Sequence, residues 1–126
     1  MKVLATFARL YVAELDPALD MLASLLDERP ANRFSYGELE LATVGSVLVI
    51  AGPDEALRPY RDTQATMIVD DLDGVIAFLA EHGAAVVDGP ADVPTGRNLT
   101  ARHADGAVVE YVQLAAGAAA GGTDNG

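Results

Sequence analysis

The sequence has 126 residues, no cysteine and a formal net charge of −11, from 19 acidic and 8 basic side chains. A chain of this length suits one domain with a single core. The acidic balance argues against binding to nucleic acid or to an anionic membrane surface, both of which need clustered Lys and Arg. The lack of cysteine excludes disulfides, thiolate nucleophiles and Cys-ligated zinc sites.

The N-terminal segment lacks the features of a secretory signal peptide. Its apolar run is interrupted by Arg9 and ends at Glu14, and no small-residue cleavage site follows. No segment approaches the roughly 20 consecutive apolar residues of a membrane-spanning helix. We therefore expect a cytoplasmic protein that does not bind membranes.

The first half of the chain predicts a strand, a helix and three further strands. Residues 4–12 alternate well enough for a strand and are rich in apolar, aromatic and β-branched side chains. Asp16 and Pro17 predict a helix start with the Asp16 carboxylate as cap, since proline is tolerated at the first helical position. Leucines 19, 22, 25 and 26 form one face of this helix, which Pro30 and Asn32 end. The three short strands are expected at residues 33–36, 39–43 and 46–50.

The second half repeats this plan after a linker at residues 53–61. The repeat is visible in five residue pairs that share an offset of 57 positions: Val12 and Val69, Leu15 and Leu72, Asp16 and Asp73, Leu19 and Ile76, and Leu22 and Leu79. Residues 63–69 predict a strand, Asp73 caps the second helix, and Gly83 ends it in a left-handed conformation. Three strands are expected at residues 85–88, 99–103 and 107–114.

The two modules, residues 1–52 and 62–114, predict one α+β domain spanning residues 1–114. Each module alone would bury little, because a sheet needs a helix or another sheet to cover it. Side by side, two βαβββ modules would form one curved eight-stranded sheet with both helices on the outer face. The concave face would be left for a ligand. The tail, residues 115–126, has no periodic face and is expected to be disordered.

The repeated junctions LYVAELDPAL and MIVDDLDGVI, with HADGAVVEYVQL near the end, resemble the vicinal-oxygen-chelate superfamily over about residues 3–114. This superfamily has the glyoxalase/bleomycin-resistance fold and includes glyoxalase I, extradiol dioxygenases, fosfomycin-modifying enzymes and bleomycin-resistance proteins. Its closing motif usually runs Asp-Pro-Asp-Gly-Asn-x-x-Glu. Asp105, Gly106 and Glu110 match that motif, whereas the residues at positions 103, 104 and 107 do not.

The resemblance implies four positions for the ligands of a divalent metal, in the first and last strands of each half. These positions hold Phe7, Val49, Gln64 and Glu110. Val49 is placed by aligning the turn at Gly45 with the turn at Gly106. An aromatic ring and an alkyl group cannot coordinate a cation, so two donors remain against the roughly three protein ligands of a catalytic metal. A shift of one residue in the first half supplies no better donor, and we predict no metal and no cofactor.

Strand alternation completes the candidate ligand site. The residues expected to pack under the helices are Leu10, Val12, Met67, Val69, Leu99 and Ala101. The residues expected to contact a ligand are Phe7, Arg9, Tyr11, Val49, Gln64, Thr66, Ile68, Asn98, Thr100, Val108, Glu110 and Val112. Apolar walls with a few orienting polar groups are typical of a small-molecule pocket.

Structural alternatives exist for several of these residues. Phe7 would equally fill the cleft or pack at a dimer seam, and Arg9 and Glu110 would equally neutralise each other. No catalytic residues are predicted. His82 suits the end of a helix, and His103 lies in a turn beside an aspartate with no nucleophile at triad spacing.

The leading hypothesis is a metal-free binding protein of the bleomycin-resistance type. Such a protein would sequester a small organic ligand, such as an antibiotic, in a cleft at the interface of a homodimer, and so confer antibiotic resistance without turnover. The alternative is a metal-dependent enzyme, a glyoxalase-like lyase, isomerase or dioxygenase, with Glu38 or Glu40 as a further donor. A third hypothesis is a regulatory or dimerisation module whose cleft is filled by its own side chains.

Overall fold

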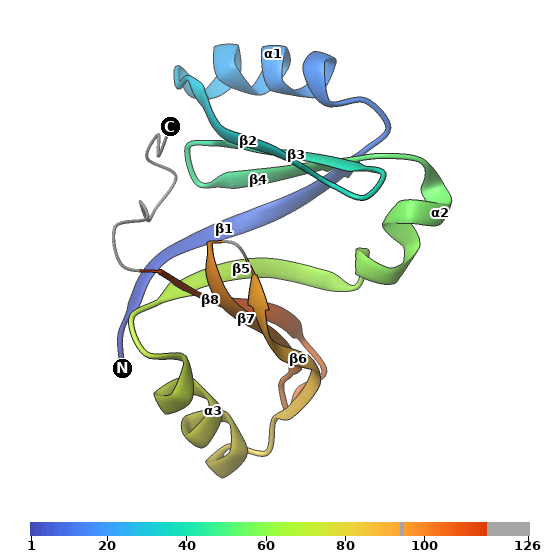
Figure 1. The fold of residues 1–126 in the computed structure, drawn as a ribbon. Helices are drawn as coiled ribbons and strands as arrows, with labels where there is room; N and C mark the ends of the chain where they lie inside the picture. Colours follow the sequence, from blue (N-terminus) through green and yellow to red (C-terminus); the bar gives the residue numbers. More distant parts are fainter. Residues whose placement is uncertain (94, 116–126) are drawn as a thin grey trace. The chain divides into compact units, whose positions relative to one another are not determined.

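A computed structural model describes residues 1–93 and 95–115 of the chain. Its elements are β1 (Val3–Val12), α1 (Leu15–Leu26), β2 (Pro30–Tyr36), β3 (Leu39–Val44), β4 (Val47–Ala51), α2 (Asp54–Leu57), the 3-10 helix η1 (Arg58–Tyr60), β5 (Thr63–Val69), α3 (Leu72–Glu81), β6 (Ala85–Val93), β7 (Gly96–Arg102) and β8 (Val108–Leu114) (Figure 1). The strands form one mixed eight-stranded sheet in the order β2-β3-β4-β1-β5-β8-β7-β6. The predicted α+β fold of two βαβββ repeats is confirmed.

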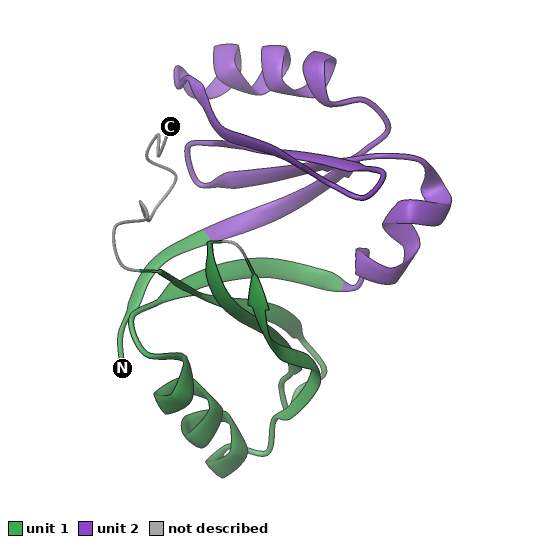
Figure 2. Ribbon diagram, in the orientation of Figure 1, with its two compact units in different colours: residues 1–6, 63–121 green, residues 7–62, 122–126 purple. Residues whose placement is uncertain are grey.

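The chain divides into two compact units (Figure 2). Of the described residues, unit 1 contains residues 1–6, 63–93 and 95–115, and unit 2 contains Phe7–Asp62. The division falls inside β1, so this strand contributes residues to both units. The segment expected as a linker, residues 53–61, contains the short helices α2 and η1. Within the described ranges, no helix is long and apolar enough to span a membrane. The predicted disordered tail lies, from residue 116 on, outside the described residues.

The core of unit 2 lies between α1 and one face of β3 and β4. Leu15, Leu19 and Leu22, spaced at helical intervals, are buried on the inner face of α1. They pack with the small and branched side chains of Ala42, Val44, Val49 and Ala51. Full burial of one leucine side chain contributes roughly 1.5–3 kcal/mol, so these three leucines account for much of the attachment of α1 to the sheet. Leu25 and Leu26, expected on the same face, are exposed at the end of the helix.

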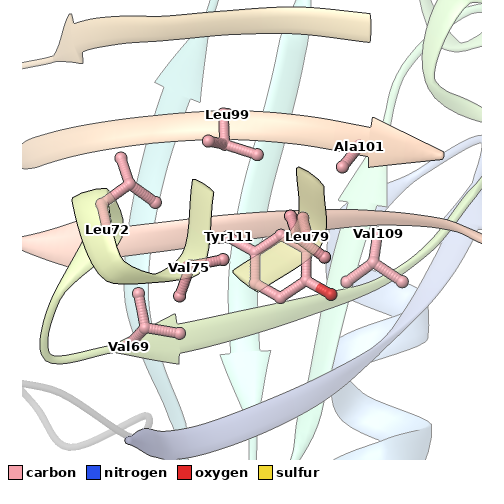
Figure 3. Packing of buried hydrophobic residues seen from close by; sticks show 8 residues of the cluster. All are labelled: Val69, Leu72, Val75, Leu79, Leu99, Ala101, Val109 and Tyr111. Carbon is pink, nitrogen blue, oxygen red and sulfur yellow. The ribbon is translucent and has the colours of Figure 1, made fainter. Parts of the chain in front are cut away.

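The core of unit 1 repeats this arrangement under α3 (Figure 3). The cluster consists of Val69, Leu72, Val75, Leu79, Leu99, Ala101, Val109 and Tyr111. Met67 packs against it as a partly buried neighbour, and Val12 does the same in unit 2. Five of the six residues expected under the helices therefore lie there. Leu10 is different, because its side chain remains 41% exposed.

Both helices begin before the aspartates that were expected to cap them. Residue 14 is the N-cap of α1, so Asp16 lies in the first turn and pairs with Arg33 at 2.7 Å. In α3 the cap is Asp71, whose Oδ1 accepts the backbone N–H of Gly74 at 3.0 Å. A cap must have extended backbone dihedrals and reach the third helical N–H, and Asp71 meets both conditions. Gly83 has the expected left-handed conformation, with φ of 77°.

The strands at the two ends of the sheet order, β2 and β6, are irregular. The pairing of β2 with β3 shifts between Ala31 and Phe34, where Asn32 has φ of 54°. The pairing of β6 with β7 shifts twice, on either side of Asp88. β6 was expected to end at Asp88, but it continues through Pro90 to Val93 because an end strand does not need every backbone N–H for a ladder.

Candidate functional site

The strand register of unit 2 separates a face covered by α1 from the opposite face, since directly paired residues share a face. The opposite face is called the helix-free face because α1 does not cover it; the 3-10 helix η1 contacts it at Tyr11. Pairing places Tyr11 of β1 beside Ile50 of β4, Ile50 beside Leu41 of β3, and Leu41 beside Phe34 of β2. This row of four side chains lies opposite the core residues Ala42, Val49 and Ala51. A second row on the same face is Arg9, Leu48 and Thr43. The helix-free face of unit 2 is therefore largely apolar, with aromatic side chains at both ends of one row.

Val49 does not lie on this face, and its assignment to the ligand site is wrong in geometric terms. It pairs with Leu10 and Ala42 and is 0% exposed in the core under α1. Leu48, paired with Arg9, takes the place that Glu110 takes beside Thr66 in the other repeat. The reason is the turn length. Leu48 is three residues after its turn glycine, whereas Glu110 is four residues after the corresponding glycine.

Phe7, Arg9 and Tyr11 lie on the helix-free face of β1, as alternation predicted. Phe7 is buried, at 5% exposure. Arg9 donates from Nη1 to the Tyr11 hydroxyl oxygen at 3.0 Å, and the Tyr11 hydroxyl donates to the backbone carbonyl of Tyr60 in η1. These two bonds hold the polar ends of Arg9 and Tyr11 in place and connect β1 to η1. The predicted pairing of Arg9 with Glu110 stays a prediction.

The helix-free face of unit 1 carries a polar row across β5, β8 and β7. Glu110 pairs with Thr66 on one side and with Thr100 on the other. The Thr66 hydroxyl donates to Glu110 Oε1 at 3.0 Å, and the Asn98 side-chain amide donates to Oε2 at 3.2 Å. Thr66 is 5% exposed, so its bond to a carboxylate is a charge-assisted hydrogen bond sheltered from water. Side chains from two strands thus fix both oxygens of Glu110.

Apolar side chains surround this polar row. Ile68 pairs with Val112, which in turn pairs with Asn98, and Val108 pairs with Thr63. Ile68 and Val108 are buried, and Val112 is half-buried. Gln64 is exposed and lies where the pairing of β5 with β8 shifts, between Thr63 and Ala65. The structure therefore brings together all the predicted residues of unit 1 except Gln64, whose place in the ladder is irregular.

The residues present do not fit the divalent metal that the sequence resemblance implies. The four corresponding positions hold Phe7, Leu48, Gln64 and Glu110, and the first two offer no donor atom. Both oxygens of Glu110 already accept hydrogen bonds from neutral side chains. Within residues 1–93 and 95–115, no group of three or more His, Asp or Glu side chains could hold a metal ion.

Glu38 and Glu40, which the sequence offered as further metal ligands, do not complete a metal site. Glu40 pairs with Ala51 on the face covered by α1 and contacts Arg33 at 3.3 Å. Glu38 lines an open depression of about 370 Å³ beside Glu14 and the first turn of α1. Neither carboxylate belongs to the helix-free face of unit 2.

The two histidines have structural roles. His103 Nε2 lies 2.6 Å from the hydroxyl oxygen of Tyr111, a core residue, and burial raises the pKa of the Tyr111 phenol. Asp105 accepts the backbone N–H of Ala107 in the turn, and His82 Nδ1 lies 2.7 Å from the Phe78 carbonyl oxygen. These contacts give both histidines a structural role, and neither needs a catalytic one.

Two aromatic residues on the helix-free face were missed by the sequence reasoning. Phe34 and Tyr36 lie there because they pair with Leu41 and Leu39. They are 52% and 62% exposed. The available signal was the spacing Phe-Ser-Tyr, which places two rings on one face of a strand.

Comparison with known proteins gives matches among solved structures, while no family model and no curated protein matches the chain. An uncharacterized protein from Methanosarcina mazei is 50% identical, with 91% of this chain and 95% of that chain covered and a TM-score of 0.87. Methylmalonyl-CoA epimerase from Mycobacterium tuberculosis is 18% identical, with 90% and 89% covered and a TM-score of 0.70. A variant of Streptomyces coelicolor methylmalonyl-CoA epimerase in complex with 2-nitronate-propionyl-CoA is 14% identical, with 91% and 97% covered and a TM-score of 0.70.

The duplicated eight-stranded fold is shared with these methylmalonyl-CoA epimerase structures, and it is the fold that the sequence resemblance implied. The chain belongs to the same family as the uncharacterized Methanosarcina mazei protein, with which it shares half of its aligned residues. The epimerases are too distant in sequence to establish more than the fold.

Proposed function

We propose that the protein binds a small organic molecule on its helix-free faces without a metal ion. The observation that supports this most directly is the Glu110 carboxylate, held between Thr66 and Asn98 on a face that also carries the apolar side chains of Ile68, Val108 and Val112. A fixed polar group in an apolar wall orients a ligand through hydrogen bonds. A metal site would instead require several convergent donor atoms, which the corresponding positions do not supply.

The chemistry of unit 1 suggests an amphipathic ligand. This unit offers the polar row of Thr66, Glu110 and Thr100 together with the apolar side chains of Ile68, Val108 and Val112. The net charge of −11 favours a neutral or cationic molecule over an anionic one. An antibiotic-like compound, sequestered without turnover by a cytoplasmic homodimer, meets this description.

A second candidate is a vicinal-oxygen-chelate enzyme, such as an isomerase. It is favoured by the similarity to methylmalonyl-CoA epimerases over about nine-tenths of the chain. In such an enzyme, Glu110 would be the group of the polar row able to accept a proton. A metal would require ligands other than those at the superfamily positions.

Bound metal distinguishes the two candidates. The protein is purified without chelator, and its metal content is measured by mass spectrometry before and after addition of Ni, Zn, Mn and Fe. Thermal shift is then measured with a set of antibiotics and with methylmalonyl-CoA. Glu110→Gln is the test variant, and Glu55→Gln, at an exposed position of α2, is the matched control.

We expect no stoichiometric metal and a thermal shift with at least one organic compound. Loss of a hydrogen bond to a charged group costs roughly 1.5–3 kcal/mol, so Glu110→Gln should weaken that binding roughly 10- to 150-fold, with Glu55→Gln unchanged. Near-stoichiometric metal that is lost in Glu110→Gln would refute the proposal and favour the enzyme.

A further inference from the structure

We propose that Phe34 and Tyr36 form a stacking site for a planar aromatic ring, an inference that rests on the ligand-binding function proposed above. Both residues lie on the helix-free face of β2 and expose about half or more of their surface, 52% and 62%. Among the described residues, neither ring stacks on another aromatic ring. About half or more of each residue's surface is therefore accessible to a ligand.

The distance between the two residues along the strand is close to the distance needed to hold one aromatic ring between two others. Residues i and i+2 of a strand project from the same face, about 6.8 Å apart at a rise of roughly 3.4 Å per residue. A planar ring in van der Waals contact on both sides needs about 7 Å, because carbon atoms approach to about 3.5 Å. Phe34 and Tyr36 are thus placed to hold one ring between them.

The side chains next to this pair are apolar. Tyr36 pairs with Leu39, which is buried, and Phe34 pairs with Leu41. From Leu41 the row continues to Ile50, which is 2% exposed, so the accessible apolar surface beside the pair ends near Leu41.

The local backbone favours a small ligand over a second protein strand at this place. β2 is interrupted between Ala31 and Phe34, and Asn32 in that interruption has a left-handed conformation. An irregular end strand is a poor template for backbone pairing with another chain. The net charge of −11 also disfavours an anionic ring system. The ligand class is therefore a planar aromatic molecule that is neutral or cationic.

The test uses proflavine, a planar aromatic cation, with spermidine as an aliphatic cation that cannot stack. Binding to the full chain is measured by absorbance and calorimetry for wild type, Phe34→Ala, Tyr36→Ala and Phe34→Leu. Phe78→Ala is the control, because Phe78 is an exposed aromatic residue on α3. Sedimentation of each variant reports the oligomeric state.

We expect proflavine to bind and spermidine not to bind. Each alanine variant should weaken proflavine binding about 2- to 10-fold, and Phe34→Leu should also weaken it because leucine retains apolar area but no ring face. Phe78→Ala should leave the affinity unchanged.

Three results would overturn the stacking site: no binding of proflavine, binding that neither alanine variant weakens, or an oligomer that the alanine variants dissociate. The last result would identify this face as a subunit interface. If stacking fails while Glu110→Gln still removes a thermal shift, the proposed function survives without this inference. If proflavine binding depends on Phe34 and Tyr36 while Glu110→Gln changes nothing, the stacking site stands and the role of Glu110 is wrong.

Discussion

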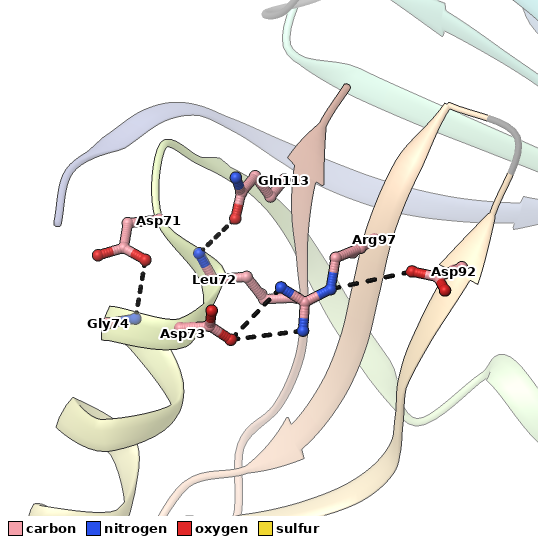
Figure 4. A network of polar contacts seen from close by, with 7 residues as sticks. All are labelled: Asp71, Leu72, Asp73, Gly74, Asp92, Arg97 and Gln113. Carbon is pink, nitrogen blue, oxygen red and sulfur yellow. Dashed lines mark hydrogen bonds and ion pairs between the residues drawn. The ribbon is translucent and has the colours of Figure 1, made fainter. Parts of the chain in front are cut away.

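The side chain of Gln113 should be a major determinant of the stability of unit 1. Gln113 Oε1, on β8, accepts the backbone N–H of Leu72 at 2.7 Å, at the start of α3 (Figure 4). Leu72 is 0% exposed, so its N–H has little access to water when this acceptor is removed. An unsatisfied buried donor costs about 1–3 kcal/mol, a large part of the roughly 5–15 kcal/mol that stabilises a domain. Gln113→Ala should therefore destabilise the protein by about 2 kcal/mol.

Urea denaturation followed by circular dichroism measures this loss. For a denaturant slope of about 2 kcal/mol per molar, the unfolding midpoint should fall by roughly 1 M. Gln113→Glu keeps an acceptor oxygen and should recover most of the stability. Gln64→Ala, at an exposed glutamine, should stay within about 0.5 kcal/mol of wild type. Equal midpoints for Gln113→Ala and Gln64→Ala would refute the reasoning.

Two further predictions test the core. Burial raises the pKa of Tyr111 above its usual 10.0, so the native state holds this proton more tightly than the unfolded state. Stability from this group is complete below pH 10 and is lost as the pH rises through the native pKa. Tyr111→Phe should flatten that alkaline decline in denaturation curves, and Tyr36→Phe should not. Val49→Asp places a carboxylate at a fully buried position and should abolish folding, as judged by circular dichroism. A folded Val49→Asp protein would show that Val49 faces away from the core.

The internal repeat made the fold predictable from the sequence. A constant offset identifies equivalent strands and helices in the two halves, and alternation then sorts Met67 and Val69 from Thr66 and Ile68. The placement of Glu110 opposite the core followed from the same rule. These features depend on local patterns, which a sequence carries directly.

The remaining features depend on details that local patterns leave open. Three aspartates precede α3, and only the backbone conformation shows that Asp71 is the cap. The face of Val49 depends on a turn that differs by one residue between the repeats, and alignment at the glycines hides that difference. The importance of Phe34 and Tyr36 depends on exposure, which two neighbouring aromatic residues do not reveal by themselves.

The irregular strand β6 has a consequence for how the protein behaves at high concentration. Val86 and Val87 are exposed on this end strand, and a flat, apolar end strand is a template for amyloid-like polymerisation. Pro90 offers no backbone N–H to an incoming chain, the ladder is broken on both sides of Asp88, and Asp92 adds a second negative charge. An added strand could therefore not continue along β6, and this protects the folded protein from fibre growth at that end of the sheet.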